Sequence, residues 1–322
     1  MERRQFLATA ASGTLALSQG AFGQAFPSRP VRLIVPFAPG GSTDVIARAM
    51  SEGLARELGQ PVVVENKAGA GGAIGIQEML RAAPDGHAFA IVSPSNTAAV
   101  PAVSPKIGYH PVNDFTPIMY VAAVPWLIAV NPSFPARTYQ EFVAELKKHP
   151  GRHSYASSGV GGVLHLNMEV FKSLTGTFIT HIPYRGAGPA VADVMAGQVA
   201  IAVDSPTSIP AIRDGRLVPI VVAAPQRMKE HPNMPTFAEV GLPALNRMSH
   251  FGFVGPKGMP RAAVDRLNAA MRKVLQDPAV RTRLEGAGAT IIASSPEEFG
   301  AEIKGLYELL QRVVVERKIT AD

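Results

Sequence analysis

The chain has 322 residues with a formal net charge of +6, from 31 Lys and Arg against 25 Asp and Glu, and it contains no cysteine. The lack of cysteine excludes disulfides, thiolate metal sites, cysteine nucleophiles and a lipid-modified N-terminal cysteine. The basic residues are scattered along the chain, which argues against a nucleic-acid partner and weakly favours a small acidic ligand. This length is sufficient for two domains, each with its own core.

The first 25 residues are expected to be an export signal rather than part of the fold. Arg3 and Arg4 precede a mildly apolar stretch, and the small residues Gly23-Gln24-Ala25 form a cleavage site. The paired arginines resemble a twin-arginine signal, with the general secretory route as the alternative. We therefore expect a periplasmic protein whose signal is cleaved after Ala25.

Short β-branched runs alternate with amphipathic segments along the rest of the chain. This alternation predicts an α/β fold with mostly parallel sheets flanked by helices. Strands are expected at 31–35, 62–64, 88–92, 118–130, 179–182, 199–203, 217–223, 251–255 and 290–293. Helices are expected at 43–58, 73–82, 139–148, 163–174, 189–196, 262–275 and 296–315. Ser42 or Thr43 is expected to cap the first of these helices, and Gly59 to end it.

Two proline-rich passages indicate a boundary between domains. They span residues 130–135 and 234–243 and have the composition of connecting segments. We expect a first domain built from residues 26–125 and 250–322. A second domain, at residues 126–249, would then be inserted between its two parts.

A predicted strand runs through a glycine turn directly into the first predicted helix, at residues 31–44. Gly40 and Gly41 have no Cβ atoms, so a ligand can approach the main chain closely. The free N–H groups at the helix start point toward that ligand, and the helix dipole favours a negative charge there. The segment predicts an anion site made by the backbone. Asp44 is either a partner of the helix dipole or a ligand contact through water.

A second turn rich in short hydroxyls and glycines precedes the helix predicted at 163–174. Ser157 and Ser158 can donate to a carboxylate oxygen, and the N–H groups that follow them add charge-assisted bonds. Capping of the helix by a serine is the alternative explanation. Because two such turns lie in separate predicted domains, we favour ligand binding.

Other motifs give weaker signals. Gly69 and Gly71 begin a glycine cluster, but Ile74 occupies the place where a dinucleotide fingerprint requires glycine, so no nucleotide cofactor is expected. His149 and His153 are separated by Pro150-Gly151, which breaks the helix that a paired metal site would need. We therefore expect neither a cofactor nor a metal.

A serine hydrolase is the competing hypothesis from another class of protein. Ser157 and Ser158 lack the G-x-S-x-G elbow around them, and His165, which follows on the helix, more often fills a structural position than a catalytic one. Two charged residues are further candidates for the ligand site. Asp204 ends an apolar strand where parallel-sheet proteins place ligand groups. Arg185 is either a cation at the rim or a solvated surface residue.

Together, several of these segments resemble the Bug family, the extracytoplasmic substrate-binding components of tripartite tricarboxylate transporters. The resemblance covers essentially the whole chain after the signal. The matching segments are 27–30, 33–44, 59–67, 69–72, 83–86, 155–159, His165-Leu166, 183–186, Pro235-Thr236 and 239–243.

The resemblance implies a hinged, two-lobed periplasmic binding protein of type II, the Venus-flytrap kind, with the ligand enclosed between glycine turns of both lobes. In this family a carboxylate is held by backbone amides and ordered water at a loop that corresponds to residues 37–44. The implied ligand-binding residues are Phe37, Ala38, Gly40, Gly41, Ser42, Thr43 and Asp44 on one wall, Ser157, Ser158, Gly159 and His165 on the other, Asp204 near the variable end of the ligand, and Ser93 and Asn96 as additional donors. Ala38 and Ser205-Pro206 depart from many family members, which leaves the ligand's identity open.

The function implied by this resemblance is capture of a small carboxylate and its delivery to the membrane permease of a tripartite tricarboxylate-type transporter. We expect a monomer that is not an enzyme. A ligand sensor for a membrane signalling partner remains an alternative within the class of binding proteins. The alternative from another class is an exported serine hydrolase that uses Ser157 or Ser158.

Overall fold

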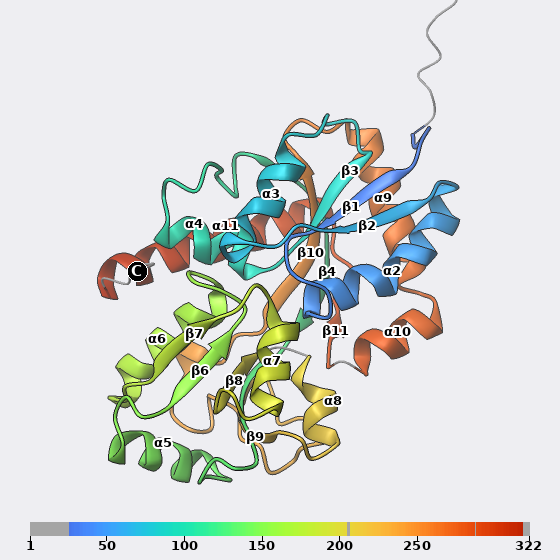
Figure 1. Ribbon diagram of the computed structural model, residues 1–322. Coiled ribbons are helices and arrows are strands. Elements are labelled where there is room, and N and C mark those ends of the chain that lie inside the picture. Colours follow the sequence, from blue (N-terminus) through green and yellow to red (C-terminus); the bar gives the residue numbers. More distant parts are fainter. Residues whose placement is uncertain (1–25, 205–206, 287, 318–322) are drawn as a thin grey trace, which may run out of the picture.

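The computed structural model describes residues 26–204, 207–286 and 288–317. The predicted export signal and Ser205-Pro206 lie outside the described residues. The described chain forms two lobes, each built on one β-sheet with helices on both faces (Figure 1). The two-lobed α/β fold is therefore confirmed.

The first lobe contains a six-stranded sheet in the order β11-β4-β10-β3-β1-β2. Its strands are β1 (Val31–Val35), β2 (Val62–Asn66), β3 (Ala88–Val92), β4 (Phe115–Val124), β10 (Ser249–Pro256) and β11 (Thr290–Ile291). One face packs against α2 (Ser42–Leu58), α9 (Arg261–Val274) and α10 (Pro278–Glu285). The other face packs against α3 (Ala73–Leu80) and α11 (Pro296–Arg317). The shorter elements of this lobe are η1 (Ala70–Gly72), the π-helical turn η2 (Ser95–Ala99) and α4 (Val100–Val103).

The second lobe contains a five-stranded sheet in the order β7-β6-β8-β5-β9. Its strands are β5 (Trp126–Val130), β6 (Ser154–Ser157), β7 (Thr180–Pro183), β8 (Ile201–Asp204) and β9 (Val218–Ala223). One face packs against α5 (Tyr139–Lys148) and α6 (Val163–Thr175). The other packs against α7 (Ala187–Met195) and α8 (Ser208–Arg213), and η3 (Pro243–Leu245) lies on the return path to the first lobe.

The sequence 118–130 was predicted as one strand, and this prediction is wrong. The chain forms β4 in the first sheet, leaves it at Pro125, and forms β5 in the second sheet. A proline has no N–H to give to a sheet, so it is a natural place for the chain to change from one sheet to the other. In Figure 1 this crossing and the return into β10 both run between the lobes.

The sheets are more mixed than expected. Three strands of each sheet are parallel: β1 pairs in parallel with β2 and β3, and β6 with β7 and β8. The strands that arrive from the other lobe, β10 and β5, run antiparallel to both of their neighbours. The direction of the crossing therefore accounts for both antiparallel pairings of the second sheet and for two of the three in the first, where the third joins β4 and β11.

The apolar pattern of the chain explains these layers. In β5, the side chains of Trp126, Ile128 and Val130 enter one core of the second lobe, and those of Leu127 and Ala129 enter the other. Because successive side chains of a strand point to opposite faces, a strand covered on both faces reads as a continuous apolar run.

Some short elements escaped prediction. They are β6, α4, α8 and α10, of four to eight residues each. Segments this short carry little periodicity, so tertiary contacts decide their structure. None of the helices in the described part of the chain is long and apolar enough to cross a membrane.

Candidate ligand-binding cleft

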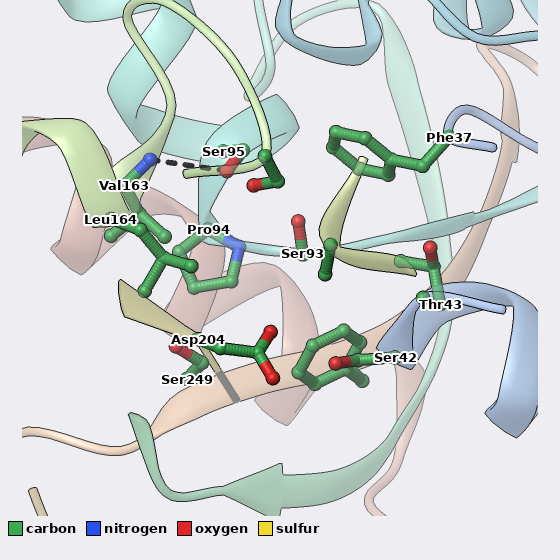
Figure 2. A pocket seen from close by; sticks show the side chains of 14 residues that line it. Phe37, Ser42, Thr43, Ser93, Pro94, Ser95, Val163, Leu164, Asp204 and Ser249 are labelled. Atoms are coloured by element: carbon green, nitrogen blue, oxygen red, sulfur yellow. Dashed lines mark hydrogen bonds between the residues drawn. The ribbon is translucent and has the colours of Figure 1, made fainter. Parts of the chain in front are cut away.

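A small cavity of ≈ 40 Å³ lies between the two lobes (Figure 2). Its walls come from the carboxyl ends of parallel strands in both sheets, from the turns and helix starts that follow them, and from the start of β10. The lining residues are Phe37, Gly41, Ser42, Thr43, Ser93, Pro94, Ser95, Ser158, Val163, Leu164, Ala187, Asp204, Ser249 and Phe251. Ligands of open α/β sheets bind at this end of the strands.

The turn between β1 and α2 presents main-chain donors to the cavity. Gly41 is the N-cap of α2 and has extended backbone angles, and no side chain caps this helix. The N–H groups of Ser42 and Thr43 donate to no acceptor among the described residues. Capping by either hydroxyl was therefore a wrong prediction, because the glycine takes the capping position and leaves these N–H groups and hydroxyls for another partner.

Asp44 holds the turn in place from behind. Its Oδ2 accepts a hydrogen bond from the Gly40 N–H at 3.0 Å, and its Oδ1 accepts from Asn66 Nδ2 at 2.9 Å and from Arg48 Nε at 2.9 Å. Burial would raise the pKa of this carboxyl, but the bonds from Arg48, Gly40 and Asn66 outweigh it, so the pKa lies below its usual range. Asp44 does not line the cavity. The structure thus places it as a support of the turn.

The turns of the two lobes are in direct contact around the cavity. The Ala38 N–H donates to the Arg185 carbonyl at 3.2 Å, and the Val163 N–H donates to Ser95 Oγ at 3.1 Å. Ser42 Oγ lies 3.4 Å from Thr207 Oγ1. These contacts tie the first lobe to the second on several sides, so the structure describes the lobes in a closed arrangement.

The two serines of the second turn have different surroundings. Ser157 is 1% exposed, and its Oγ lies 2.7 Å from His181 Nε2. Ser158 lines the cavity. Gly159 lies against the first lobe, since a Cβ on it would come 3.5 Å from Gly71 Cα. Of the two hydroxyls, the one on Ser158 is therefore placed to meet a ligand.

Three aromatic rings stack beneath this turn. The ring of His181 lies 4.8 Å from that of Tyr155 and 4.3 Å from that of His165. Burial, together with His165 and Lys172 nearby, lowers the pKa of His181 to about 3. His165 Nδ1 accepts a hydrogen bond from the Gly161 N–H at 3.1 Å, so this ring supports the turn.

The pair of Ser157 and His181 resembles a nucleophile and its base only in distance. A histidine whose pKa is about 3 takes up a proton poorly near neutral pH. Among the described residues, no carboxylate contacts His181 to orient it, and Ser157 does not line the cavity. The geometry therefore gives no support to a hydrolytic site at this serine.

Ser93 and Asn96, which follow β3, link the cavity by hydrogen bonds to the glycine turn that contains Gly71. Ser93 lines the cavity, while Asn96 is fully buried beneath it. Asn96 Oδ1 accepts from the Ser93 N–H at 3.3 Å, and its Nδ2 donates to the Gly71 carbonyl at 3.3 Å. Asn96 thus positions Ser93 and the turn at Gly71.

Asp204 is the one charged side chain among the described residues that line the cavity. It is 1% exposed, ends β8, and its Oδ2 accepts a hydrogen bond from Ser208 Oγ at 2.7 Å. Figure 2 shows its carboxylate directed toward the middle of the pocket, near Ser42. This side of the cavity therefore favours a ligand group that donates a hydrogen bond, whereas the N–H groups of α2 favour an anionic one.

The structure brings together half of the predicted site residues. Those that line the cavity are Phe37, Gly41, Ser42, Thr43, Ser93, Ser158 and Asp204. Those that stand behind or beside it are Ala38, Gly40, Asp44, Asn96, Ser157, Gly159 and His165. Arg185 is exposed and does not line the cavity, although its carbonyl joins the lobes.

Sequence reasoning did not identify several residues of the cleft. Ser95, Ser249 and Phe251 line the cavity, and His181 fixes Ser157. Ser249 and Phe251 lie at the start of β10, which enters from the other lobe, so only the topology places them here. Ser95 lies three residues after the predicted strand 88–92, and this closeness to the carboxyl end of a strand was the signal for it.

A closed cleft between two α/β lobes, lined by main-chain N–H groups and hydroxyls, defines a two-lobed solute-binding protein. The family model described as "Tripartite tricarboxylate transporter family receptor" matches residues 46–316. Protein BugT of Bordetella pertussis is 37% identical over 275 residues, which are 85% of this chain and 84% of that protein. The chain therefore belongs to the tripartite tricarboxylate transporter receptor family, and its resemblance to Bug proteins is confirmed.

Two solved structures support the same assignment. One, described as a periplasmic transporter, has 47% sequence identity and a TM-score of 0.91, and the match covers 92% of this chain and 100% of that one. The other is MatC from Rhodopseudomonas palustris with bound malate, with 33% identity and a TM-score of 0.86 over 90% of this chain and 100% of that one.

Proposed function

We propose that this protein is a periplasmic receptor that captures a small carboxylate between its lobes and delivers it to the permease of a tripartite tricarboxylate-type transporter. The observation that carries the proposal is the cleft itself. Ser42 and Thr43, whose N–H groups have no acceptor among the described residues, line the same cavity as Ser158 of the other lobe, and the turns of both lobes are in contact around it. Membership of a family of receptors supports the same role.

Such a cleft can supply the binding free energy that a receptor needs. A micromolar dissociation constant corresponds to about −8.2 kcal/mol. Each hydrogen bond to a charged group contributes about 1.5 to 3 kcal/mol, from which the costs of ordering ligand and lobes are subtracted. Three or four such bonds from the main chain and the serines give about 4.5 to 12 kcal/mol before those costs are subtracted, so they supply much of this affinity without an arginine, and burial of the apolar part of the ligand supplies the rest.

The mechanism follows from the position of the cavity. A ligand that touches both lobes stabilises the closed arrangement to the extent that it binds this arrangement better than the open one. We assign residues 26–125 and 250–322 to one moving body and residues 126–249 to the other. The carboxylate would lie at the start of α2, and a hydroxyl or another donor of the ligand would lie near Asp204.

The first test identifies the ligand class. Mass spectrometry of small molecules released from gently purified protein should recover a carboxylic acid. In a thermal-shift screen, malate and related mono- and dicarboxylates should raise the melting temperature, because a ligand that binds only the folded state stabilises it. Recovery of a neutral sugar, or no response to any acid, would contradict the proposal.

Serine variants separate a receptor from a hydrolase. For Ser158→Ala we expect weaker binding of the identified acid, by about tenfold for one lost bond to a charge. Ser51→Ala is the matched control, because Ser51 bonds to the Arg48 carbonyl on the outer side of α2. Ester hydrolysis that is lost in Ser157→Ala or Ser158→Ala would favour the enzyme.

Uptake of the acid by cells that lack and then regain the protein distinguishes delivery from sensing.

A further inference from the structure

A second, larger cavity of ≈ 260 Å³ lies next to the crossing between the lobes. One wall is α11 of the first lobe and the opposite wall is α6 of the second, and both lie on the left of Figure 1. The returning segment 244–249 forms a third side. We call this cavity the hinge groove. It shares Pro94, Val163 and Ser249 with the cleft between the glycine turns, so the two cavities are separated by a thin layer of protein.

The lining of the hinge groove is mostly apolar. The fully buried Trp126 lines it, and α11 contributes Leu306, Leu309, Leu310 and Val313. Three of these α11 side chains, all but Leu306, are only half-buried. An apolar cavity of this size at a domain boundary has the character of a small-molecule site. It differs in chemistry from the first cleft, whose lining is rich in hydroxyls.

The polar groups of the groove favour an anion. Arg247 is the one charged side chain among the described residues that line it, and its side chain is 48% exposed. Its Nη2 donates to Glu302 Oε1 at 3.0 Å, while Nε and Nη1 donate to no acceptor in the described part of the chain. A guanidinium has five N–H donors, so it can hold Glu302 and a second carboxylate together. Asn167, on α6, offers an amide with no partner among the described residues.

We propose that the hinge groove binds a second ligand, a monocarboxylate with a hydrocarbon or aromatic body. Its apolar body lies between α6 and α11, and its carboxylate meets Arg247 at the mouth. Because the ligand contacts a helix of each lobe, it binds best when α6 and α11 have the relative positions seen in this structure. It therefore favours the closed arrangement.

The probe for this site is octanoate, and the intrinsic fluorescence of the protein's tryptophan reports its binding. Trp126 is the single tryptophan of the sequence and forms part of the groove. We expect octanoate to change its fluorescence in a saturable manner. 1-Octanol has the same chain without the charge and is expected to bind about tenfold more weakly.

Two variants locate the site and one serves as the matched control. Arg247→Leu is expected to weaken octanoate binding about tenfold, and Ala244→Phe, at an exposed position, to block the groove with its ring. Glu302→Gln breaks the same ion pair as Arg247→Leu but keeps the guanidinium, so binding is expected to stay equal or become tighter. Circular dichroism and urea midpoints establish that the variants are folded.

Several outcomes would overturn the proposal. The first is that wild-type protein shows no saturable response to octanoate. The second is that Arg247→Leu and Ala244→Phe both bind octanoate as the wild type does, which would place the probe in the cleft between the glycine turns. The third is that Glu302→Gln weakens binding as much as Arg247→Leu, because the ion pair rather than the cation would then be required.

Discussion

Asp44 shows how one charged residue can serve an anion site without touching the anion. It lies at the start of α2, where a negative charge is favoured, and it is 4% exposed. Its carboxylate accepts hydrogen bonds from Gly40 in the turn, from Arg48 on α2 and from Asn66 on β2. It therefore occupies none of the N–H groups of Ser42 and Thr43 at the cavity. The sequence left two roles open for this residue, and the hydrogen bonds favour the supporting one.

The first prediction concerns Asp44→Asn, which keeps the shape of the side chain but loses the charge and one acceptor. We expect the free energy of unfolding to fall by about 1–3 kcal/mol, because buried donors of Gly40, Asn66 or Arg48 lose their partner. Urea denaturation near neutral pH measures this. Glu52→Gln is the control, because Glu52 forms an exposed i,i+4 pair with Arg56 on the same helix, and its loss should change the value by less than about 0.5 kcal/mol. Equal effects in the two variants would contradict the assigned role.

The second prediction concerns His181, whose pKa lies at about 3 in the fold against 6.5 for an exposed histidine. Between these values the unfolded chain binds a proton that the folded chain does not bind. The contribution of this residue to stability is therefore complete above pH 6.5 and declines as the pH falls toward 3. In His181→Gln that part of the decline should be missing, so the slope of unfolding free energy against pH should be smaller between pH 6 and 4. Parallel slopes for variant and wild type would show that burial of this ring is not the cause.

At the scale of elements, the sequence predicted those features that depend on residues close together in the chain. The alternation of strand and helix, the glycine turn after β1 and the end of α2 at Gly59 depend on near neighbours in the sequence, and they lie where expected. The contacts that complete the cleft join distant residues, such as Ser95 with Val163 and Ser157 with His181. Sequence periodicity does not indicate which distant residues come into contact. For this reason the roles of His181 and Ser95 at the cleft were not predicted.

The third prediction compares two glycines that both have positive φ. Gly59 (φ +71°) has nothing within 4 Å of the place where a Cβ would stand, whereas a Cβ on Gly72 (φ +96°) would lie 2.2 Å from Asn96 Nδ2. Gly59→Ala should cost about 1 kcal/mol, from backbone strain alone. Gly72→Ala should cost about 2 kcal/mol more, since the buried Asn96 amide must move and loses its bonds. Because Asn96 positions Ser93, this variant should also weaken ligand binding. Matching urea midpoints for the two variants would refute the argument.

At the scale of the whole molecule, the two sheets repeat one plan. Apart from β11, the order β4-β10-β3-β1-β2 in the first lobe corresponds to β9-β5-β8-β6-β7 in the second. The glycine turns follow β1 and β6, the equivalent strands of the two sheets, and each leads into a helix whose N-cap is glycine. Two helix starts are thereby brought to opposite sides of one cavity. The closed arrangement then depends on backbones that approach each other without intervening side chains.

The last prediction tests that dependence with Gly188, on α7 of the second lobe. A Cβ on this residue would lie 2.8 Å from the Pro39 carbonyl oxygen and 3.3 Å from the Gly40 carbonyl carbon, both in the first lobe. Within α7 itself, alanine is the better helix former by about 1 kcal/mol, so Gly188→Ala should fold as well as the wild type. Closure should be obstructed, because the added methyl group meets the glycine turn. We therefore expect weaker binding of the identified acid and a larger radius of gyration by small-angle scattering in its presence.

Gly305→Ala is the matched control, since Gly305 lies in α11 with nothing within 4 Å of its Cβ position. This variant should gain the helix stability without losing affinity for the acid. Unchanged affinity in Gly188→Ala would mean that the ligand is held without contact between these two turns.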